Sequence, residues 1–207
     1  MIFLRNESFR TYLRLYPLTS FFIGVNTVVM LFTTVLGWQN NPYMLYAYTS
    51  FAADFPLQDR WWTILTFSFV HNGWMHFLFN MFMMYLIAPP LEQRLGRSRY
   101  LLLWLWLIFS TALGLYALRA GAAVGASGVD YGFLGLYLYY MWRGPRWLDR
   151  QSESVILAFI VLGAISTLII PGVSIAGHLG GFVGGLLFGF LFARKRWERS
   201  AWERRFY

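Results

Sequence analysis

The chain has 207 residues, of which 58% are apolar, 21% are aromatic and only 13% are charged. A soluble domain of this length could not bury so much apolar surface, so the excess must face lipid. The formal net charge of +8 does not indicate a nucleic-acid partner, because the basic residues stand in short clusters between apolar runs. The absence of cysteine excludes disulfides, thiolate nucleophiles and thiolate metal sites.

Six apolar runs come close to the roughly 20 residues that a helix needs to cross the hydrocarbon of a bilayer. We therefore predict an all-α, polytopic membrane protein built as a bundle of six transmembrane helices. Residues 1–18 are expected to form a cytoplasmic amino-terminal segment, residues 19–193 the six-span domain, and residues 194–207 a basic cytoplasmic tail. The predicted spans are about 19–38, 70–88, 100–119, 126–142, 153–170 and 174–193.

The first span follows a basic segment, as the apolar core of a signal peptide does. The run is too long for the apolar h-region of a typical signal peptide, and no small-x-small cleavage site follows it, so we expect it to remain as a membrane anchor. Residues 39–69 are rich in aromatic residues and almost free of basic ones. This composition favours a loop that lies in the bilayer interface.

Basic residues mark the orientation, because Lys and Arg accumulate in cytoplasmic loops. All but Arg60 and Arg119 of the 17 basic residues fall in the two terminal segments, the 2–3 loop or the 4–5 loop. Both termini are therefore predicted to be cytoplasmic. Spans 2, 4 and 6 then all begin at the outer face.

Polar residues cluster at the beginnings of those three spans. His71, His76 and His178 stand at the outer ends of spans 2 and 6, and Ser127 opens span 4. Ionisable residues inside a membrane face the interior of the bundle and are candidates for function. The sequence therefore predicts a shallow polar site near the outer surface.

Small residues indicate how closely the helices of this site approach one another. Span 6 has glycine every fourth residue from Gly177, and span 4 has Gly128, Gly132 and Gly135, a pattern that permits close backbone contact. Close contact would bring Ser127 toward His178, which has a suitable pKa for accepting the serine proton. Asn80 and His76 lie four residues apart on one helical face, and could donate hydrogen bonds to an oxyanion together with the Ser127 backbone N–H.

Two other chemical interpretations use the same residues. Asp130 could suggest a Ser-His-Asp triad, but a residue three positions after Ser127 would struggle to reach the far side of the His178 ring, so it is left out of the mechanism. Three histidines at one depth could also ligate a metal. The five-residue spacing of His71 and His76 and the lack of a neighbouring carboxylate argue against that site, so no metal or cofactor is expected.

These motifs resemble those of a known family. The run from His71 through His76 to Asn80 resembles the H-x-x-x-x-H-x-x-x-N signature of rhomboid proteases, and Gly125-Ala126-Ser127-Gly128 resembles their G-x-S-G motif. The segment from Gly177-His178 to Gly181 resembles the histidine motif of their last helix. The resemblance covers about residues 19–193.

The resemblance implies a catalytic dyad of Ser127 and His178 without a third acid, and an oxyanion hole made by His76, Asn80 and the Ser127 amide. Tyr131 would pack against the histidine, His71 would support the loop, and Gly125, Gly128 and Gly181 would support the site. The implied activity is cleavage of transmembrane segments of membrane-protein substrates near the outer face of a prokaryotic inner membrane, among membrane lipids. A rhomboid-like protein that binds client helices without cutting them is the alternative, and a metal-binding or transport role is a third.

Overall fold

The computed structural model describes residues 2–4, 6–41, 43–45, 50–51, 60–143 and 147–193. Within these ranges the chain is helical and has no strand beyond one isolated bridge between Phe51 and Ala123, which confirms the all-α class. The helical elements are α1 (Phe9–Leu15), α2 (Pro17–Val35), η1 (Trp38–Asn40), α5 (Thr63–Thr66), η2 (Phe67–Phe69), α6 (Trp74–Leu95), α7 (Arg97–Ala117), α8 (Ser127–Trp142), α9 (Arg150–Ile169) and α10 (Ile175–Phe192).

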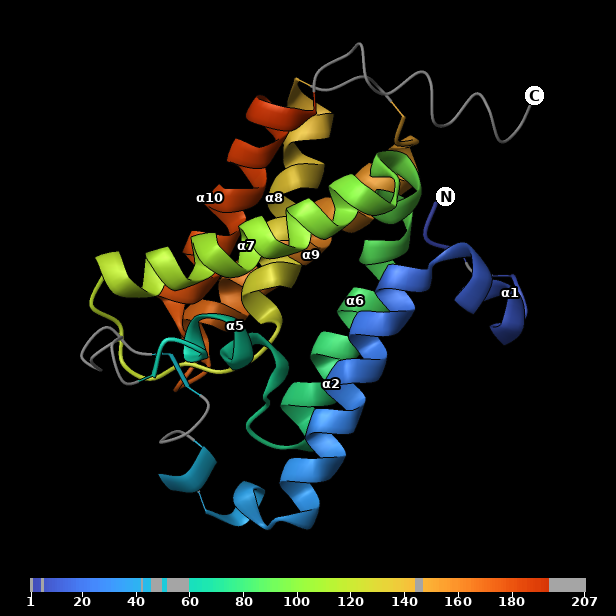
Figure 1. The fold of residues 1–207 in the computed structure, drawn as a ribbon. Coiled ribbons are helices and arrows are strands. Elements are labelled where there is room, and N and C mark those ends of the chain that lie inside the picture. Colours follow the sequence, from blue (N-terminus) through green and yellow to red (C-terminus); the bar gives the residue numbers. More distant parts are fainter. Residues whose placement is uncertain are drawn as a thin grey trace.

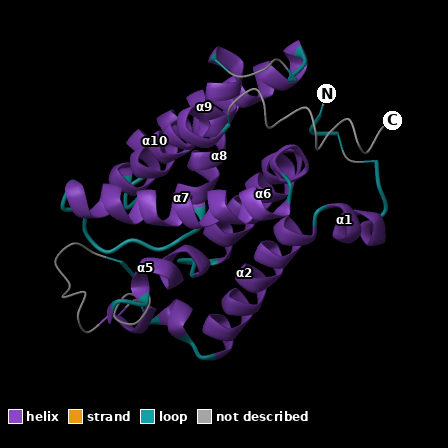
Figure 2. Ribbon diagram, turned by 45° about the horizontal axis from the view of Figure 1, so that its top comes forward, coloured by secondary structure: helices purple, strands orange, loops and turns teal. Residues whose placement is uncertain are grey.

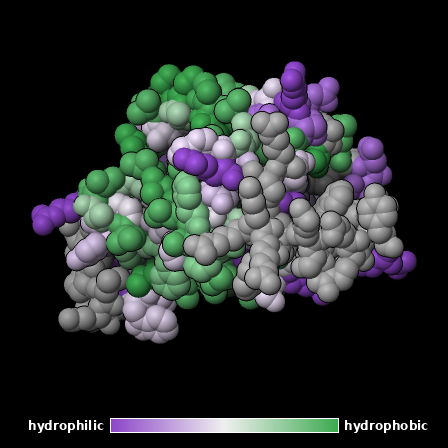
Figure 3. All heavy atoms as spheres, turned by 90° about the horizontal axis from the view of Figure 1, so that it is seen from above, coloured by the Kyte–Doolittle hydropathy of each residue, from purple (hydrophilic) through white to green (hydrophobic). Residues whose placement is uncertain are grey.

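Five of these helices, α2, α6, α7, α9 and α10, are long and apolar enough to cross a membrane. The sixth long helix, α8, has 16 residues and is shorter than a typical span. Apolar side chains gather over the left and upper parts of the face in Figure 3, and hydrophilic side chains stand at its left and upper right edges and at one place near its middle. The chain is thus an integral membrane protein with a helical bundle, and five of the six predicted spans have the length and composition of a span.

Helix α8 occupies the centre of the bundle and packs most extensively against α10, which also packs against α7 (Figure 1). On the other side, α2 lies beside α6, as both ribbon views show (Figures 1 and 2). Helix α9 has only three buried residues, Ser152, Ile156 and Thr167. It is therefore the long helix least embedded in the bundle.

The predicted second span, 70–88, was wrong at both ends. Helix α6 begins at Trp74, after Gly73 with a φ of +89°, and it continues through Pro89 and Pro90 to Leu95. A proline pair normally ends a helix, because each proline lacks the N–H that its turn requires. Here both prolines are buried, and packing against neighbouring helices keeps this part of the chain helical.

The first predicted span, 19–38, agrees with α2 to within three residues at both ends. Helix α2 begins at Pro17, whose fixed φ suits the first turn of a helix, and it ends at Val35 because Gly37 takes a left-handed conformation. The bounds of the other four spans lie within three residues of those predicted. The basic tail, 194–207, and part of the predicted interfacial loop lie outside the described residues.

A buried carboxylate joins α6 to the beginning of α2. The Glu92 carboxylate accepts hydrogen bonds from the backbone N–H groups of Leu18 and Thr19, at 2.9 and 2.8 Å, and from the Thr19 hydroxyl at 2.7 Å. The first turn of a helix has N–H groups without intrahelical partners and a partial positive charge. Glu92 therefore caps α2 and fixes the position of α2 beside α6.

Candidate active site

Ser127 is the first residue of α8, and a glycine with a positive φ sets the path of the chain into it. Gly125 has a φ of +121°, and a Cβ there would meet the His76 ring at 2.6 Å, so only glycine fits. The Gly125 N–H donates to the Phe67 carbonyl at 2.8 Å. The loop before Ser127 is thereby held between η2 and the first turn of α6.

Close packing of α8 and α10 brings Ser127 to His178. A Cβ at Gly181 would overlap the Gly128 carbonyl, so the two backbones touch. Next to this contact, Ser127 Oγ lies 2.8 Å from His178 Nε2, which is within hydrogen-bond reach. The predicted nucleophile and the predicted base thus meet, although 51 residues separate them in sequence.

Two further side chains contact the His178 ring, one on its face and one at Nδ1. The Tyr131 ring stacks on it, with centroids 4.0 Å apart and planes inclined by 15°. His178 Nδ1 lies 2.7 Å from the hydroxyl of Thr167 on α9. Sequence reasoning missed Thr167, because a threonine in an apolar helix carries no signal of its own.

The two residues predicted to form the oxyanion hole with Ser127 lie on one face of α6. His76 packs its ring against Gly125, and its Nδ1 lies 3.3 Å from the Asn72 backbone N–H. Asn80 is almost fully buried, and its side-chain amide donates to the His76 carbonyl at 2.7 Å. His76 therefore lies directly beside the loop that carries Ser127, and Asn80 lies one turn further along.

His71 is fully buried in the loop before α6, and its ring contacts that of His76 at a centroid distance of 5.1 Å. Burial, and next the neighbouring His76, lower the pKa of His71 to about 3. Gln39 holds this loop, donating to the His71 carbonyl at 3.1 Å and accepting from the Gly73 N–H at 2.9 Å. The role of Gln39 was likewise not visible in the sequence.

Asp130 lies buried in the first turn of α8. Neither of its carboxylate oxygens has a hydrogen-bond partner among the residues that the structure describes. Nδ1 of His178, where the acid of a triad would bind, contacts Thr167 instead. Over the same described residues, no group of three His, Asp or Glu side chains is arranged to hold a metal ion.

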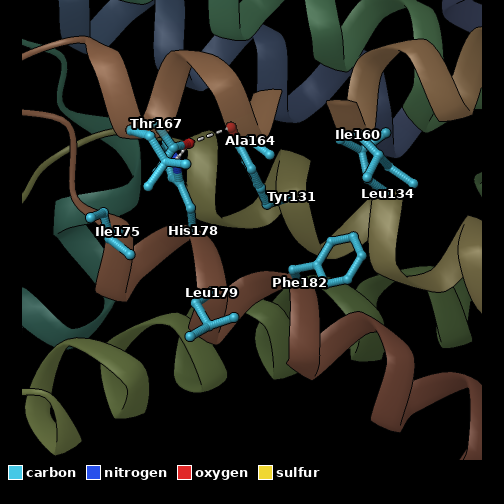
Figure 4. Close-up of a pocket in the computed structure, with 10 residues that line it drawn as sticks. Tyr131, Leu134, Ile160, Ala164, Thr167, Ile175, His178, Leu179 and Phe182 are labelled. Atoms are coloured by element: carbon cyan, nitrogen blue, oxygen red, sulfur yellow. Dashed lines mark hydrogen bonds between the residues drawn. The ribbon is translucent and has the colours of Figure 1, made fainter. Parts of the chain in front are cut away.

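A cavity of about 270 Å³ extends from His178 between α8, α9 and α10. Figure 4 shows Tyr131, Thr167 and His178 gathered at one end, while Leu134, Ile160 and Phe182 line the other. His178 and Thr167 thus stand at the edge of an apolar cavity. An apolar cavity with a few polar side chains at one end is typical of a site that binds an apolar ligand and orients it through those polar groups.

The fold and the site define an integral membrane protein with a Ser-His pair inside its helical bundle. The Rhomboid domain family matches residues 58–195, which is more than half of the chain. The chain belongs to the rhomboid family.

Several named proteins are similar to this chain. It is 29% identical over 205 residues to "Putative rhomboid protease YdcA" of Bacillus subtilis (strain 168), covering 96% of this chain and 100% of that protein. It is 35% identical over 146 residues to "Rhomboid-type serine protease 2" of Emericella nidulans, covering 68% of this chain and 29% of that protein. "Rhomboid protease GluP" of B. subtilis is 25% identical over 167 residues, covering 81% of this chain and 33% of that protein.

Proposed function

We propose that this protein is an intramembrane serine endopeptidase that cleaves transmembrane segments of other membrane proteins, with Ser127 as nucleophile and His178 as base. The observation that carries the proposal is the 2.8 Å contact between Ser127 Oγ and His178 Nε2. A serine hydroxyl becomes a useful nucleophile only when a base within this distance accepts its proton. The names of the similar proteins, which describe proteases, support the same activity.

The reaction needs no cofactor. As Ser127 Oγ bonds to the carbonyl carbon of the scissile peptide, its proton passes to His178 Nε2 and the carbonyl oxygen becomes an oxyanion. His178 then protonates the departing amine, which leaves an acyl-enzyme on Ser127. A water molecule, deprotonated by His178, attacks the ester and releases the second product with Ser127 restored.

The oxyanion is stabilised by groups beside Ser127. Ser127 is the first residue of α8, where backbone N–H groups point out of the helix and the helix dipole is positive. His76 lies beside the preceding glycine, and the Asn80 amide has a second N–H besides the one bonded to the His76 carbonyl. These are the donors that we assign to the oxyanion hole.

The position of the catalytic residues along the bundle indicates the kind of substrate. Ser127, His178 and His76 stand at or near the beginnings of α8, α10 and α6, so all three lie toward one end of the bundle. The basic residues of the loops support our proposal that this end lies at the outer face of the cytoplasmic membrane, with both termini inside. The substrate is then a transmembrane helix that opens locally near its outer end, since a peptide bond within a helix is shielded.

Labelling with a fluorophosphonate tests the nucleophile. In monodisperse detergent-solubilised protein, the wild type should be labelled at Ser127, and His178→Ala should lose most of the label because the base is gone. Absence of labelling, with client helices still bound equally by wild type and Ser127→Ala, would support the non-catalytic binding protein instead. Label on a different residue would show that the nucleophile is misassigned.

A further inference from the structure

A hydroxyl on α9 occupies the side of the His178 ring that faces away from Ser127. Thr167 is buried, with an exposed fraction of 8%, and its Oγ1 lies 2.7 Å from His178 Nδ1. The same oxygen lies 2.7 Å from the Tyr131 hydroxyl (Figure 4). It also lies 2.8 Å from the Gly163 carbonyl. Thr167 is thus the one residue in this network that contacts both the ring nitrogen and the tyrosine.

The position of the ring proton decides whether His178 can act as a base. A neutral imidazole carries one proton, and Nε2 can accept from Ser127 only if that proton is on Nδ1. The group that bonds the remote ring nitrogen sets the tautomer. The partner of Nδ1, at 2.7 Å, therefore decides whether Nε2 can accept the Ser127 proton across the 2.8 Å contact.

The hydrogen-bond partners around Thr167 favour the productive tautomer. The Gly163 carbonyl can only accept, and it receives hydrogen bonds from the hydroxyls of Tyr131, at 2.6 Å, and Thr167, at 2.8 Å. When the Thr167 hydroxyl proton points at this carbonyl, the hydrogen bond between Thr167 and His178 must take its proton from the imidazole. The proton then sits on Nδ1 and leaves Nε2 free to accept.

We propose that Thr167 is a positioning residue that accepts a hydrogen bond from Nδ1–H of His178 and so holds the imidazole in the tautomer that can deprotonate Ser127. This inference rests on the proposed function of Ser127 and His178. It adds a residue that acts on the nucleophile only through His178. It also ties α9, which has few other buried residues, to the catalytic ring.

Three variants separate the hydroxyl from the shape of the side chain. Thr167→Val keeps the shape and removes the hydroxyl, and loss of one neutral hydrogen bond should lower kcat by roughly tenfold with KM nearly unchanged. Thr167→Ser should restore kcat to near the wild-type value. Ser166→Ala is the matched control, since Ser166 bonds the same Gly163 carbonyl at 2.8 Å and should leave kcat unchanged. Wild-type kcat in Thr167→Val would overturn the proposal.

A second measurement does not depend on activity or on a variant of Thr167. The chain has three histidines, so ¹⁵N-histidine labelling of the wild type gives few side-chain signals, and His178→Ala identifies those of His178. Neutral His178 should show the chemical shifts of an Nδ1–H tautomer, and the shifts of an Nε2–H tautomer would overturn the proposal. Failure of the proposed function would look different: the wild type would not cut, or Ser127→Ala would cut, whatever the tautomer.

Discussion

The backbone of Gly181 on α10 rests directly on the carbonyl of Gly128 on α8, with no room between them for a Cβ. This contact lies next to the Ser127–His178 pair, because each glycine is within three residues of one member of the pair. The separation of the two backbones therefore determines whether the serine and the histidine can touch.

Gly181→Ala should lower both thermal stability and activity. The added methyl group would force α8 and α10 apart, and overpacking of this kind costs about 1–3 kcal/mol. Gly24→Ala on α2 is the control, because a Cβ at Gly24 meets nothing within 4 Å. Unfolding curves in detergent and cleavage rates measure both effects. If Gly181→Ala retained wild-type stability and cleavage rate, close helix contact would not position the pair.

Tyr131 allows the stacked ring to be separated from its hydroxyl. Tyr131→Phe keeps the ring 4.0 Å from His178 and should retain most of the activity, since Thr167 still bonds the Gly163 carbonyl. Tyr131→Leu removes the ring, and loss of an aromatic contact should lower kcat by roughly two- to tenfold. The comparison uses kcat values from detergent assays. Equal kcat in the two variants would show that stacking has no part in holding His178.

Glu92 should be essential for stability and have no part in the chemistry. Glu92→Gln replaces an acceptor oxygen with an NH₂ group, which leaves an N–H of Leu18 or Thr19 without its partner. We expect a loss of about 1–3 kcal/mol in the free energy of unfolding. Glu153→Gln, in the first turn of α9, is the control and should change little. Equal unfolding curves for the two variants would exclude the capping role.

His71 predicts a pH dependence of stability. Its pKa is about 3 in the folded protein against 6.5 for an ordinary histidine, so the unfolded chain binds a proton in this range and the folded chain does not. Stability should therefore fall as the pH is lowered from 6.5 toward 3. His71→Gln should show a shallower fall in melting temperature than the wild type. An unchanged slope would mean that His71 does not remain neutral when buried.

The sequence predicts the membrane bundle well, because apolar runs and basic loops follow directly from the free energy of burying residues in lipid. It also predicts that Ser127, His178 and His76 lie near the beginnings of helices at one end of the bundle. They stand at the beginnings of spans 4, 6 and 2, and all even-numbered spans cross the membrane in the same direction. It fails at Pro89 and Pro90, where packing rather than local preference keeps α6 helical.

The network around His178 was only partly predictable. Tyr131 follows Ser127 by four residues and so shares its helical face, which the sequence shows. Thr167 and Gly163 lie on a different helix. The contact of Thr167 with His178 and that of Gly163 with Tyr131 depend on how α9 packs beside α8 and α10. Neither the spacing nor the residue type of Thr167 indicates that arrangement.

Reconstitution in liposomes tests the central claim most directly. Wild type and Ser127→Ala, each combined with a generic single-pass membrane substrate, are compared by gel, and mass spectrometry locates the cut. The account predicts that only the wild type cuts, near the outer boundary of the substrate's transmembrane segment. Equal cutting by both proteins would contradict the assignment of Ser127, and cutting by neither, with substrate bound to both, would contradict the protease itself.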